Sequence, residues 1–260
     1  MKNIFTLLIA LGVATTVSAC GECGCSIDAF SSAVLPDQNI HFIRVGFSQQ
    51  HFTGTWLDEV DAQHKVSEHY QQLQLSGRYA VNSRWILSSE LPVFFNNLSI
   101  PGALSDKQKG FGDLRISVRY NILADSRSKA GNLIQNLSIG GGLKVPTGLR
   151  DSETDHANEF PEFTFQPGSG SWDPFFIAGY NFRYKNWGWS FDQRVQISTV
   201  NKENTRYGHR YQAALRSFYW LGNEKLTALP WLGYQFDFLG ETVQDGFSLP
   251  YTSGDRKSVV

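Results

Sequence analysis

The chain has 260 residues, a formal net charge of −1 and a mean hydropathy of −0.28, with 41% hydrophobic and 14% aromatic residues. A charge this close to zero gives no support for a nucleic-acid partner. Beyond the N-terminal region no stretch reaches the roughly 18 consecutive apolar residues of a membrane helix. A wall of alternating strands needs only half its residues to be apolar, so a membrane location stays compatible with this composition.

The N-terminus has the pattern of an export signal. Lys2 gives it a basic start, an apolar run follows, and Val17–Ala19 supplies small residues before the cleavage point. These features assign residues 1–19 to a signal peptide. Val17–Cys20 also resembles a bacterial lipobox, in which Cys20 becomes the lipidated first residue of the mature chain. Ordinary cleavage, which leaves Cys20 as a plain thiol, is the alternative.

Residues 20–39 form the next segment, which contains the cysteines and shows no strand period. We predict a periplasmic arm or a plug of the lumen. Cys20, Cys23 and Cys25 are spaced C-x-x-C-x-C, and thiolates this close together suit soft metals such as Cu(I) or Zn(II). An oxidising envelope favours a disulfide instead, and lipidation of Cys20 would leave a weaker two-thiol site. The sequence leaves these alternatives open.

From residue 40 onward apolar and polar residues alternate. Leu114, Ile116 and Val118 interleave with Arg115 and Ser117, so one face of that strand suits lipid and the other suits water. About nine such stretches follow one another, the signature of an antiparallel transmembrane β-barrel. Their expected ranges are 40–50, 69–80, 84–95, 111–123, 134–146, 171–184, 187–200, 207–221 and 226–239.

The connections also follow the habit of barrels. Most of them alternate between short turns, expected on the periplasmic side, and longer loops outside, among them 53–68 and 96–110. We assign the barrel to residues 40–254 and a non-strand tail to 255–260. Bacterial single-chain barrels have an even number of strands, so nine visible strands and a loop-like end predict that C-terminal strands are missing.

Four motifs, in order, resemble a family of bacterial outer-membrane transporters related to the phenol-degradation meta-pathway outer-membrane proteins. Phe111–Leu114 with the following Val-Arg-Tyr resembles its strand pattern, and Gly142–Gly148 resembles its G-x-K-x-P-T-G strand end. Gln166–Asp173 resembles its Q-P-G-T-G-S-W-D signature. Cys20–Ser26 resembles the C-x-x-C-x-C-S start of one branch. The resemblance implies an outer-membrane barrel of about twelve strands; it does not imply a particular cargo.

The polar face of the predicted strands carries more basic than acidic residues. A basic lumen favours anionic solutes, although arginine–carboxylate pairs could instead cross the lumen and fill it. We expect Arg115, Arg119, Arg194, Arg210 and Arg216 to line the lumen and screen the solute. The basic set is Arg78, Arg84, Arg115, Arg119, Lys144, Arg183, Arg194, Arg210 and Arg216, and the acidic set is Glu90, Asp113, Asp192 and Asp237.

These observations predict a porin-like transporter or passive channel of the bacterial outer membrane for a small solute, with an anion as the best match. The alternative is an envelope protein that binds metal through Cys20, Cys23 and Cys25 and uses the barrel as a membrane platform. We expect no enzymatic activity, because no strand interior carries the His and Ser pair that a barrel phospholipase needs at its lipid face. No cofactor is expected. Expected partners are outer-membrane lipid, the barrel-assembly machinery and the solute.

Overall fold

The computed structural model describes residues 41–57, 63–100, 104–127, 133–149, 166–222, 227–228, 230–248 and 254–259. All regular secondary structure in these ranges is β-strand. No helix in the described part of the chain is long and apolar enough to cross a membrane. The predicted signal peptide and the arm with Cys20, Cys23 and Cys25 lie outside the described residues.

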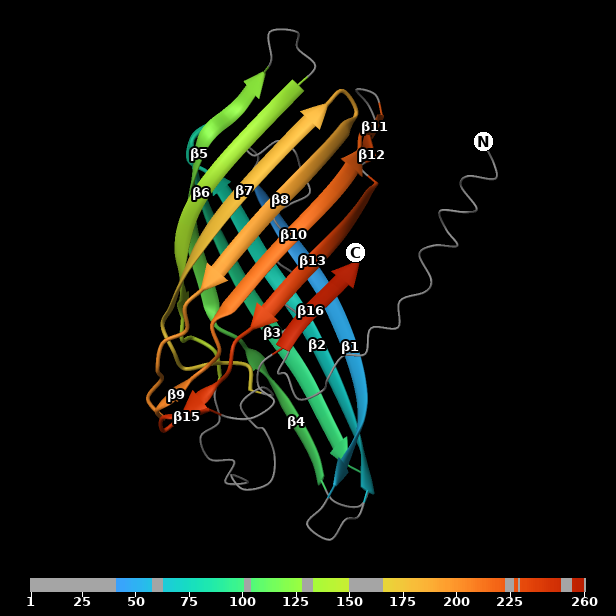
Figure 1. Ribbon diagram of the computed structural model, residues 1–260, viewed down its shortest axis with the longest axis vertical. Coiled ribbons are helices and arrows are strands. Elements are labelled where there is room, and N and C mark those ends of the chain that lie inside the picture. The colour runs from blue at the N-terminus through green and yellow to red at the C-terminus, as the bar shows by residue number, and fades with distance from the viewer. Residues whose placement is uncertain are drawn as a thin grey trace, which may run out of the picture.

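The strands form a meander in which neighbours along the chain pair in antiparallel fashion (Figure 1). The long strands are β1 (Phe42–Leu57), β2 (Gln63–Ala80), β3 (Trp85–Ile100), β4 (Leu104–Phe111), β5 (Leu114–Arg127), β6 (Leu133–Val145), β7 (Asp173–Tyr184), β8 (Trp187–Gln196), β10 (Arg210–Tyr219) and β13 (Trp231–Leu239). The short ones are β9 (Thr205–Arg206), β11 (Leu221–Gly222), β12 (Thr227–Ala228), β14 (Val243–Gln244), β15 (Phe247–Ser248) and β16 (Gly254–Val259).

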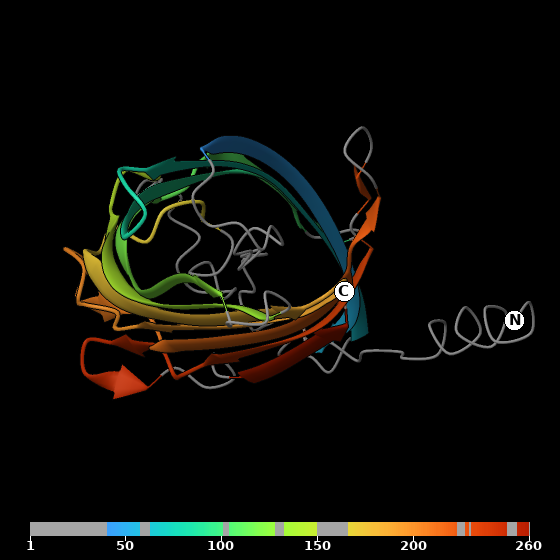
Figure 2. The same cartoon turned by 90° about the horizontal axis from the view of Figure 1, so that it is seen from above.

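One main sheet runs in the order β1-β2-β3-β5-β6-β7-β8-β10-β13-β16, with β4 paired to β3. β4 and β5 both lie along β3, so they are two lengths of one strand interrupted at Gly112 and Asp113. Figure 2 shows that the sheet curves round until the edge formed by β16 approaches β1. No pairing joins those two edges among the described residues. The architecture is therefore the all-β, antiparallel, barrel-like wall that the alternation predicts.

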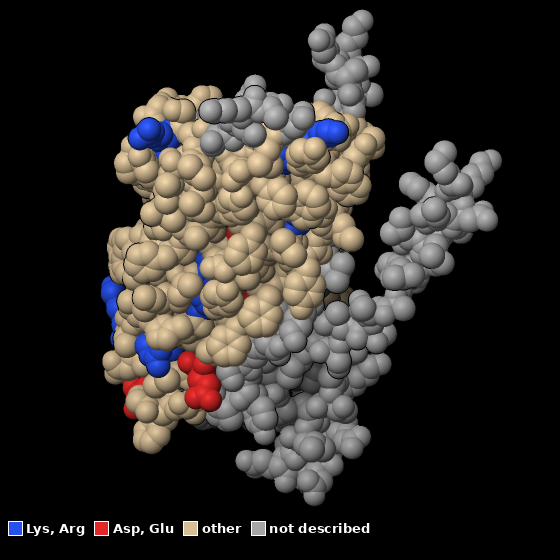
Figure 3. Space-filling model, turned by 45° about the horizontal axis from the view of Figure 1, so that its top comes forward, with Lys and Arg blue, Asp and Glu red and all other residues tan. Residues whose placement is uncertain are grey.

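The two faces of the wall have the predicted character. Apolar side chains point outward and are exposed. Figure 3 shows one face on which the side chains of Lys, Arg, Asp and Glu cover only a small part of the surface that is not grey. Polar and charged side chains point inward and are buried. The exposed outward set includes Ile43, Val45, Phe47, Leu75, Tyr79, Leu87, Ile116, Val118, Ile139, Phe176, Phe191, Val195, Leu215, Leu232 and Tyr234. The buried inward set includes Gln72, Gln74, Ser117, Asn121, Asn136, Ser138, Ser190, Gln196 and Gln212.

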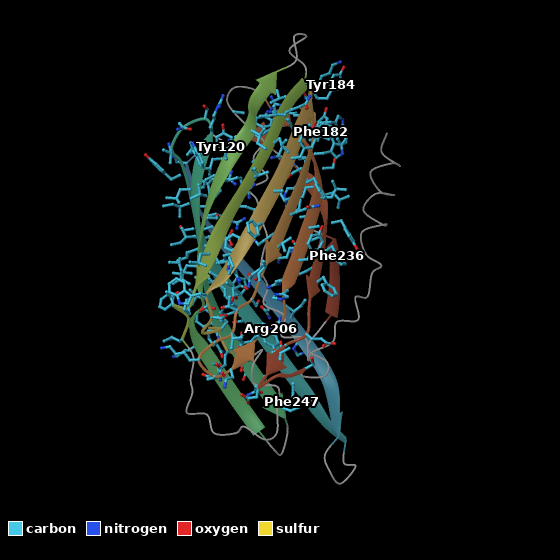
Figure 4. All side chains as sticks on the ribbon, turned by 60° about the vertical axis from the view of Figure 1, so that its left-hand side comes forward. Tyr120, Phe182, Tyr184, Arg206, Phe236 and Phe247 are labelled. Carbon is cyan, nitrogen blue, oxygen red and sulfur yellow. The ribbon has the colours of Figure 1, made fainter. Side chains whose placement is uncertain are left out.

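Aromatic side chains gather at the end of the wall that carries the short turns. Trp187 packs against Trp189 and Tyr219, with ring centroids 6.3 and 4.8 Å away, and Phe182 stacks on Trp189 at 4.8 Å. Figure 4 places Phe182 and Tyr184 near that end and Phe247 towards the opposite one. Aromatic belts of this kind lie at membrane–water interfaces.

Three sequence-based boundaries were wrong. The predicted loop 53–68 is largely strand, because β1 continues to Leu57 and β2 begins at Gln63. The predicted loop 96–110 forms the end of β3 and most of β4. Residues 254–259 form β16, paired with β13, rather than a non-strand tail. In all three places the sequence lacks a regular alternation of apolar and polar residues, while the backbone ladder continues.

Candidate functional site: the charged interior of the wall

Asp192 is the centre of the inner charge cluster. It lies on β8, is 0% exposed, and accepts hydrogen bonds from Ser190 Oγ at 2.8 Å and from Arg216 Nη1 at 3.0 Å. Arg119 of β5 approaches from the other side, with its Nη1 3.7 Å from Asp192 Oδ1. One carboxylate thus holds two guanidinium groups that come from strands on either side of β8.

Arg119 reaches Asp192 by crossing two strands that carry glycine at the crossing points. Gly140 of β6 lies opposite Arg119 in the register, and Gly179 of β7 lies opposite Asp192. A Cβ atom at Gly179 would come within 2.9 Å of Asp192 Oδ1 and 3.1 Å of Arg119 Nη1. The absence of side chains there makes the contact between β5 and β8 possible.

A second ion pair crosses the interior. Arg194 of β8 donates to Glu90 of β3 through Nη2 at 2.9 Å and Nη1 at 3.3 Å. Between β3 and β8 lie β5, β6 and β7, so the two backbones are about 19 Å apart along the wall at 4.8 Å per strand. Side chains of this length meet only because the wall curves. This bidentate ion pair spans the interior from β3 to β8 and so reduces the free width of the space inside the wall.

A small apolar layer lies beside these charges. Phe175, Ile177 and Ala214 are buried in contact, and the Arg194 guanidinium lies 5.0 Å from the centroid of the Phe175 ring. The Phe175 ring occupies the space above Gly142, where a Cβ atom would also collide with the backbone oxygen of Ile116. Because Phe175 and Ile177 are apolar and point inward, they reduce the part of the interior that suits water.

The glycine run of β6 gives a matched prediction. Gly142→Ala is expected to destabilise the fold by about 1–3 kcal/mol, because the new methyl group has no space. Gly141→Ala is expected to be neutral or to stabilise by about 0.5–1 kcal/mol, because the Cβ atom at the outward Gly141 would make only ordinary contacts, the nearest at 3.4 Å. Urea unfolding of both variants checks this; equal effects would contradict the placement of Phe175 over Gly142.

All five predicted lumen arginines lie on the inward face. Arg115, Arg194 and Arg216 are buried, and the side chains of Arg119 and Arg210 are each 11% exposed. Arg210 forms a bidentate pair with Asp237, and Gln212 donates to the same carboxylate at 3.2 Å. Their action on a solute stays a prediction.

Basic groups outnumber acidic groups in the described interior. Some guanidinium nitrogens there, among them Arg119 Nη1 and Arg78 Nε, are buried without a hydrogen-bond partner. The described inward basic residues are Arg44, Arg78, Arg115, Arg119, Lys144, Arg194, Arg210 and Arg216, and the acidic ones are Glu90, Asp113, Asp173, Asp192 and Asp237. The part of the interior that the structure describes is polar, positive on balance and partly crossed by ion pairs.

Three of the sequence motifs meet at the end of the wall that carries the longer connections. Lys144 of the G-L-K-V-P-T-G segment contacts Asp113 Oδ2 at 3.5 Å, forms an ion pair with Asp173, and donates to Ser169 Oγ at 2.5 Å. Asp113 also accepts from Gly148 N at 3.0 Å and from Ser169 N at 2.9 Å. We call Asp113, Lys144, Ser169 and Asp173 the motif junction.

The motif junction ties the rim of the wall to neighbouring strands. Asp173 accepts from Gln196 Nε2 at 3.1 Å and from Thr199 N at 2.9 Å. Asn201 Nδ2 donates to the Ser169 carbonyl at 3.1 Å. The motif residues thus form a buried hydrogen-bonded unit that fixes the ends of β5, β6, β7 and β8 together.

The set of charged residues predicted to face the lumen differs in part from the set that the structure places on the inward face. Arg84 was expected to face the lumen, but it is exposed in the turn before β3. Arg183 lies away from the charge cluster, 5.1 Å from the Trp220 ring. Arg44 and Asp173 were absent from the predicted set of lumen charges, although the alternation around Ile43 and Trp172 placed both on the inward face. The pairing partners carry no signal in the sequence, because they come from strands far apart in the chain.

No model of a known protein family and no curated protein sequence matches the chain. Among solved structures, the fold is similar to the crystal structure of an outer membrane channel from Pseudomonas putida F1. The TM-score is 0.54 at 18% sequence identity, and the alignment covers 90% of this chain and 85% of that chain. The chain therefore shares its all-β, curled antiparallel fold with an outer membrane channel.

Proposed function

We propose that the chain is a bacterial outer-membrane channel that passes small solutes, preferentially anions, through its charged interior. The observation that carries the proposal is the inversion of polarity across the wall. Exposed apolar residues such as Val118 and Phe176 face outward, whereas Asp192, Arg194 and Arg216 are buried inside. An apolar outside suits lipid, and a polar inside suits water and solute. The fold shared with an outer membrane channel and the motif resemblance support the same function.

The preference for anions follows from the charge balance of the described interior. Basic side chains that are not neutralised by a carboxylate lower the energy of an anion in a confined, low-dielectric space and raise that of a cation. Arg78 and Arg119 contribute to this excess because the carboxylates near them, Glu90 and Asp192, already pair with Arg194 and Arg216.

The preference for small solutes follows from the Arg194–Glu90 ion pair, because it spans the interior and restricts its width. The double variant Glu90→Gln/Arg194→Gln removes this ion pair and leaves the net charge unchanged. We expect a larger single-channel conductance in planar bilayers with an unchanged reversal potential in a KCl gradient. Glu90→Gln alone adds one net positive charge and is expected to increase anion selectivity.

Leu215→Ala is the control for these measurements, because Leu215 points outward and is 52% exposed. It should leave conductance and selectivity as in the wild-type protein. A double variant that conducts no better than wild type would refute the claim that the Arg194–Glu90 ion pair restricts the width of the interior. A wild-type reversal potential on the cation-selective side would refute the anion preference.

A further inference from the structure

The outer surface of the wall contains an apolar groove of about 530 Å³. It lies over β5, β6 and β7 and is lined on its outward side by Trp85, Val118, Tyr120, Ile139, Gly141 and Phe176. Nothing in the proposed transport of a solute through the interior uses this surface. The groove is therefore a separate feature of the wall.

The groove exists because one outward position on β6 has no side chain. The register places Gly141 between Val118 of β5 and Phe176 of β7, whose side chains are 44% and 60% exposed and form the two banks. Towards the short turns the next row continues with Tyr120, Ile139 and the small Ala178. The depression therefore runs along the wall rather than ending at a single residue.

The upper end of the groove carries two aromatic rings and one cation. The rings of Trp85 and Tyr120 pack at an angle of 57° with their centroids 4.9 Å apart, and Arg84 Nη1 donates to Tyr120 Oη at 3.0 Å. Asn82 Oδ1 accepts from the backbone nitrogens of Arg84 and Trp85 at 2.8 and 2.9 Å, which fixes the turn. The guanidinium group is exposed just above the aromatic pair.

We propose that this groove binds one acyl chain of an anionic phospholipid, whose phosphate pairs with Arg84. The proposal rests on the proposed membrane location. Short turns mark the periplasmic side of a barrel, and the only charged residues described in the turns 81–84 and 185–186 are Arg84 and Lys185, both basic. Trp and Tyr rings sit at headgroup depth. An anionic headgroup at Arg84 thus places its chain beside Gly141.

The test uses the purified, folded full chain in detergent. It is titrated with phosphatidylglycerol or with phosphatidylcholine that has the same acyl chains. Native mass spectrometry then counts the lipids bound to each chain. The wild-type protein should bind one phosphatidylglycerol more tightly than phosphatidylcholine. Gly141→Ile fills the groove, where the nearest contact of a Cβ atom is 3.4 Å, and should weaken both lipids about tenfold or more by excluding two methylene groups. Arg84→Gln should reduce phosphatidylglycerol binding to the level of phosphatidylcholine.

Two variants serve as matched controls. Ala213→Ile places the same isoleucine side chain at an outward position of β10, and Lys185→Gln removes another exposed cation at the same rim. Both should leave lipid binding within about twofold of wild type, which is less than half of the tenfold effect on the free-energy scale.

Three results would overturn the proposal: equal binding by Gly141→Ile and wild type, no preference for phosphatidylglycerol, or a wild-type dimer mass that Gly141→Ile abolishes. The insertion of each variant into vesicles is measured in parallel. A chain that does not insert refutes the proposed membrane location, whereas one that inserts and conducts but binds no lipid specifically refutes only the groove as a lipid site.

Discussion

Replacing Asp192 with alanine is expected to lower the free energy of unfolding by about 3–5 kcal/mol, the usual effect of removing one partner from a buried ion pair. Asp192 is fully buried and is the shared counter-ion of Arg119 and Arg216. Its loss leaves the guanidinium groups of Arg119 and Arg216 without the carboxylate that they share. Urea unfolding in detergent micelles, followed by tryptophan fluorescence, measures the change.

Glu241→Ala is the control for this variant, because Glu241 is an acidic residue in an exposed position. Surface substitutions of this kind usually change stability by no more than about 0.5 kcal/mol. A second variant, Arg216→Met in the Asp192→Ala background, should recover part of the lost stability by removing one of the uncompensated charges. An Asp192→Ala protein as stable as Glu241→Ala would show that the inner charge cluster does not hold the wall together.

Replacing Lys144 with methionine is expected to have an effect of similar size, about 3–5 kcal/mol. Lys144 separates the carboxylates of Asp113 and Asp173, which are 6% and 0% exposed. Without the ammonium group the two buried carboxylates repel each other, and Ser169 Oγ loses its cationic donor. The same unfolding measurement detects the loss, with Lys185→Met at the exposed turn as the matched control.

A rescue variant separates repulsion from lost packing. Asp173→Asn in the Lys144→Met background removes one of the two negative charges while keeping the shape of the side chain. We expect it to regain part of the stability that Lys144→Met loses. A further loss in the double variant would contradict the interpretation that Lys144 acts mainly by neutralising these carboxylates.

The alternation of residues was sufficient to predict which face points outward in the strands that it marks. The sequence places Ile116 and Val118 opposite Arg115 and Ser117, and the structure exposes the first pair and buries the second. A period of two transfers directly to the two faces of a sheet, because successive side chains point to opposite sides. The fold class could therefore be predicted without three-dimensional information.

The contacts that form the interior could not be predicted in the same way. Glu90 and Arg194 are 104 residues apart and meet only because the wall curves. The motif junction shows the same limit, since Asp113, Lys144 and Asp173 belong to three different motifs. Residue type and strand face were visible in the sequence, but the partner of each charge depends on the curvature and register of the assembled sheet.

The extent of the strands also exceeded what alternation predicts. β1 and β2 pair through to Leu57 and Gln63, although no apolar stripe marks their ends. Backbone hydrogen bonds sustain a hairpin ladder irrespective of which side chains it carries. Polar strand ends of this kind fit the portion of a barrel hairpin that projects beyond the lipid.

The most direct test of the central claim is the electrophoretic mobility of the unheated and boiled protein in the outer-membrane fraction, after expression of all 260 residues. If the chain is an outer-membrane barrel, the unheated protein in that fraction should run as a folded band whose mobility differs from that of the unfolded chain. Boiling should shift this band to the mobility of the unfolded chain. Protein found only in aggregates or in the soluble fraction, with one mobility before and after boiling, would contradict the account.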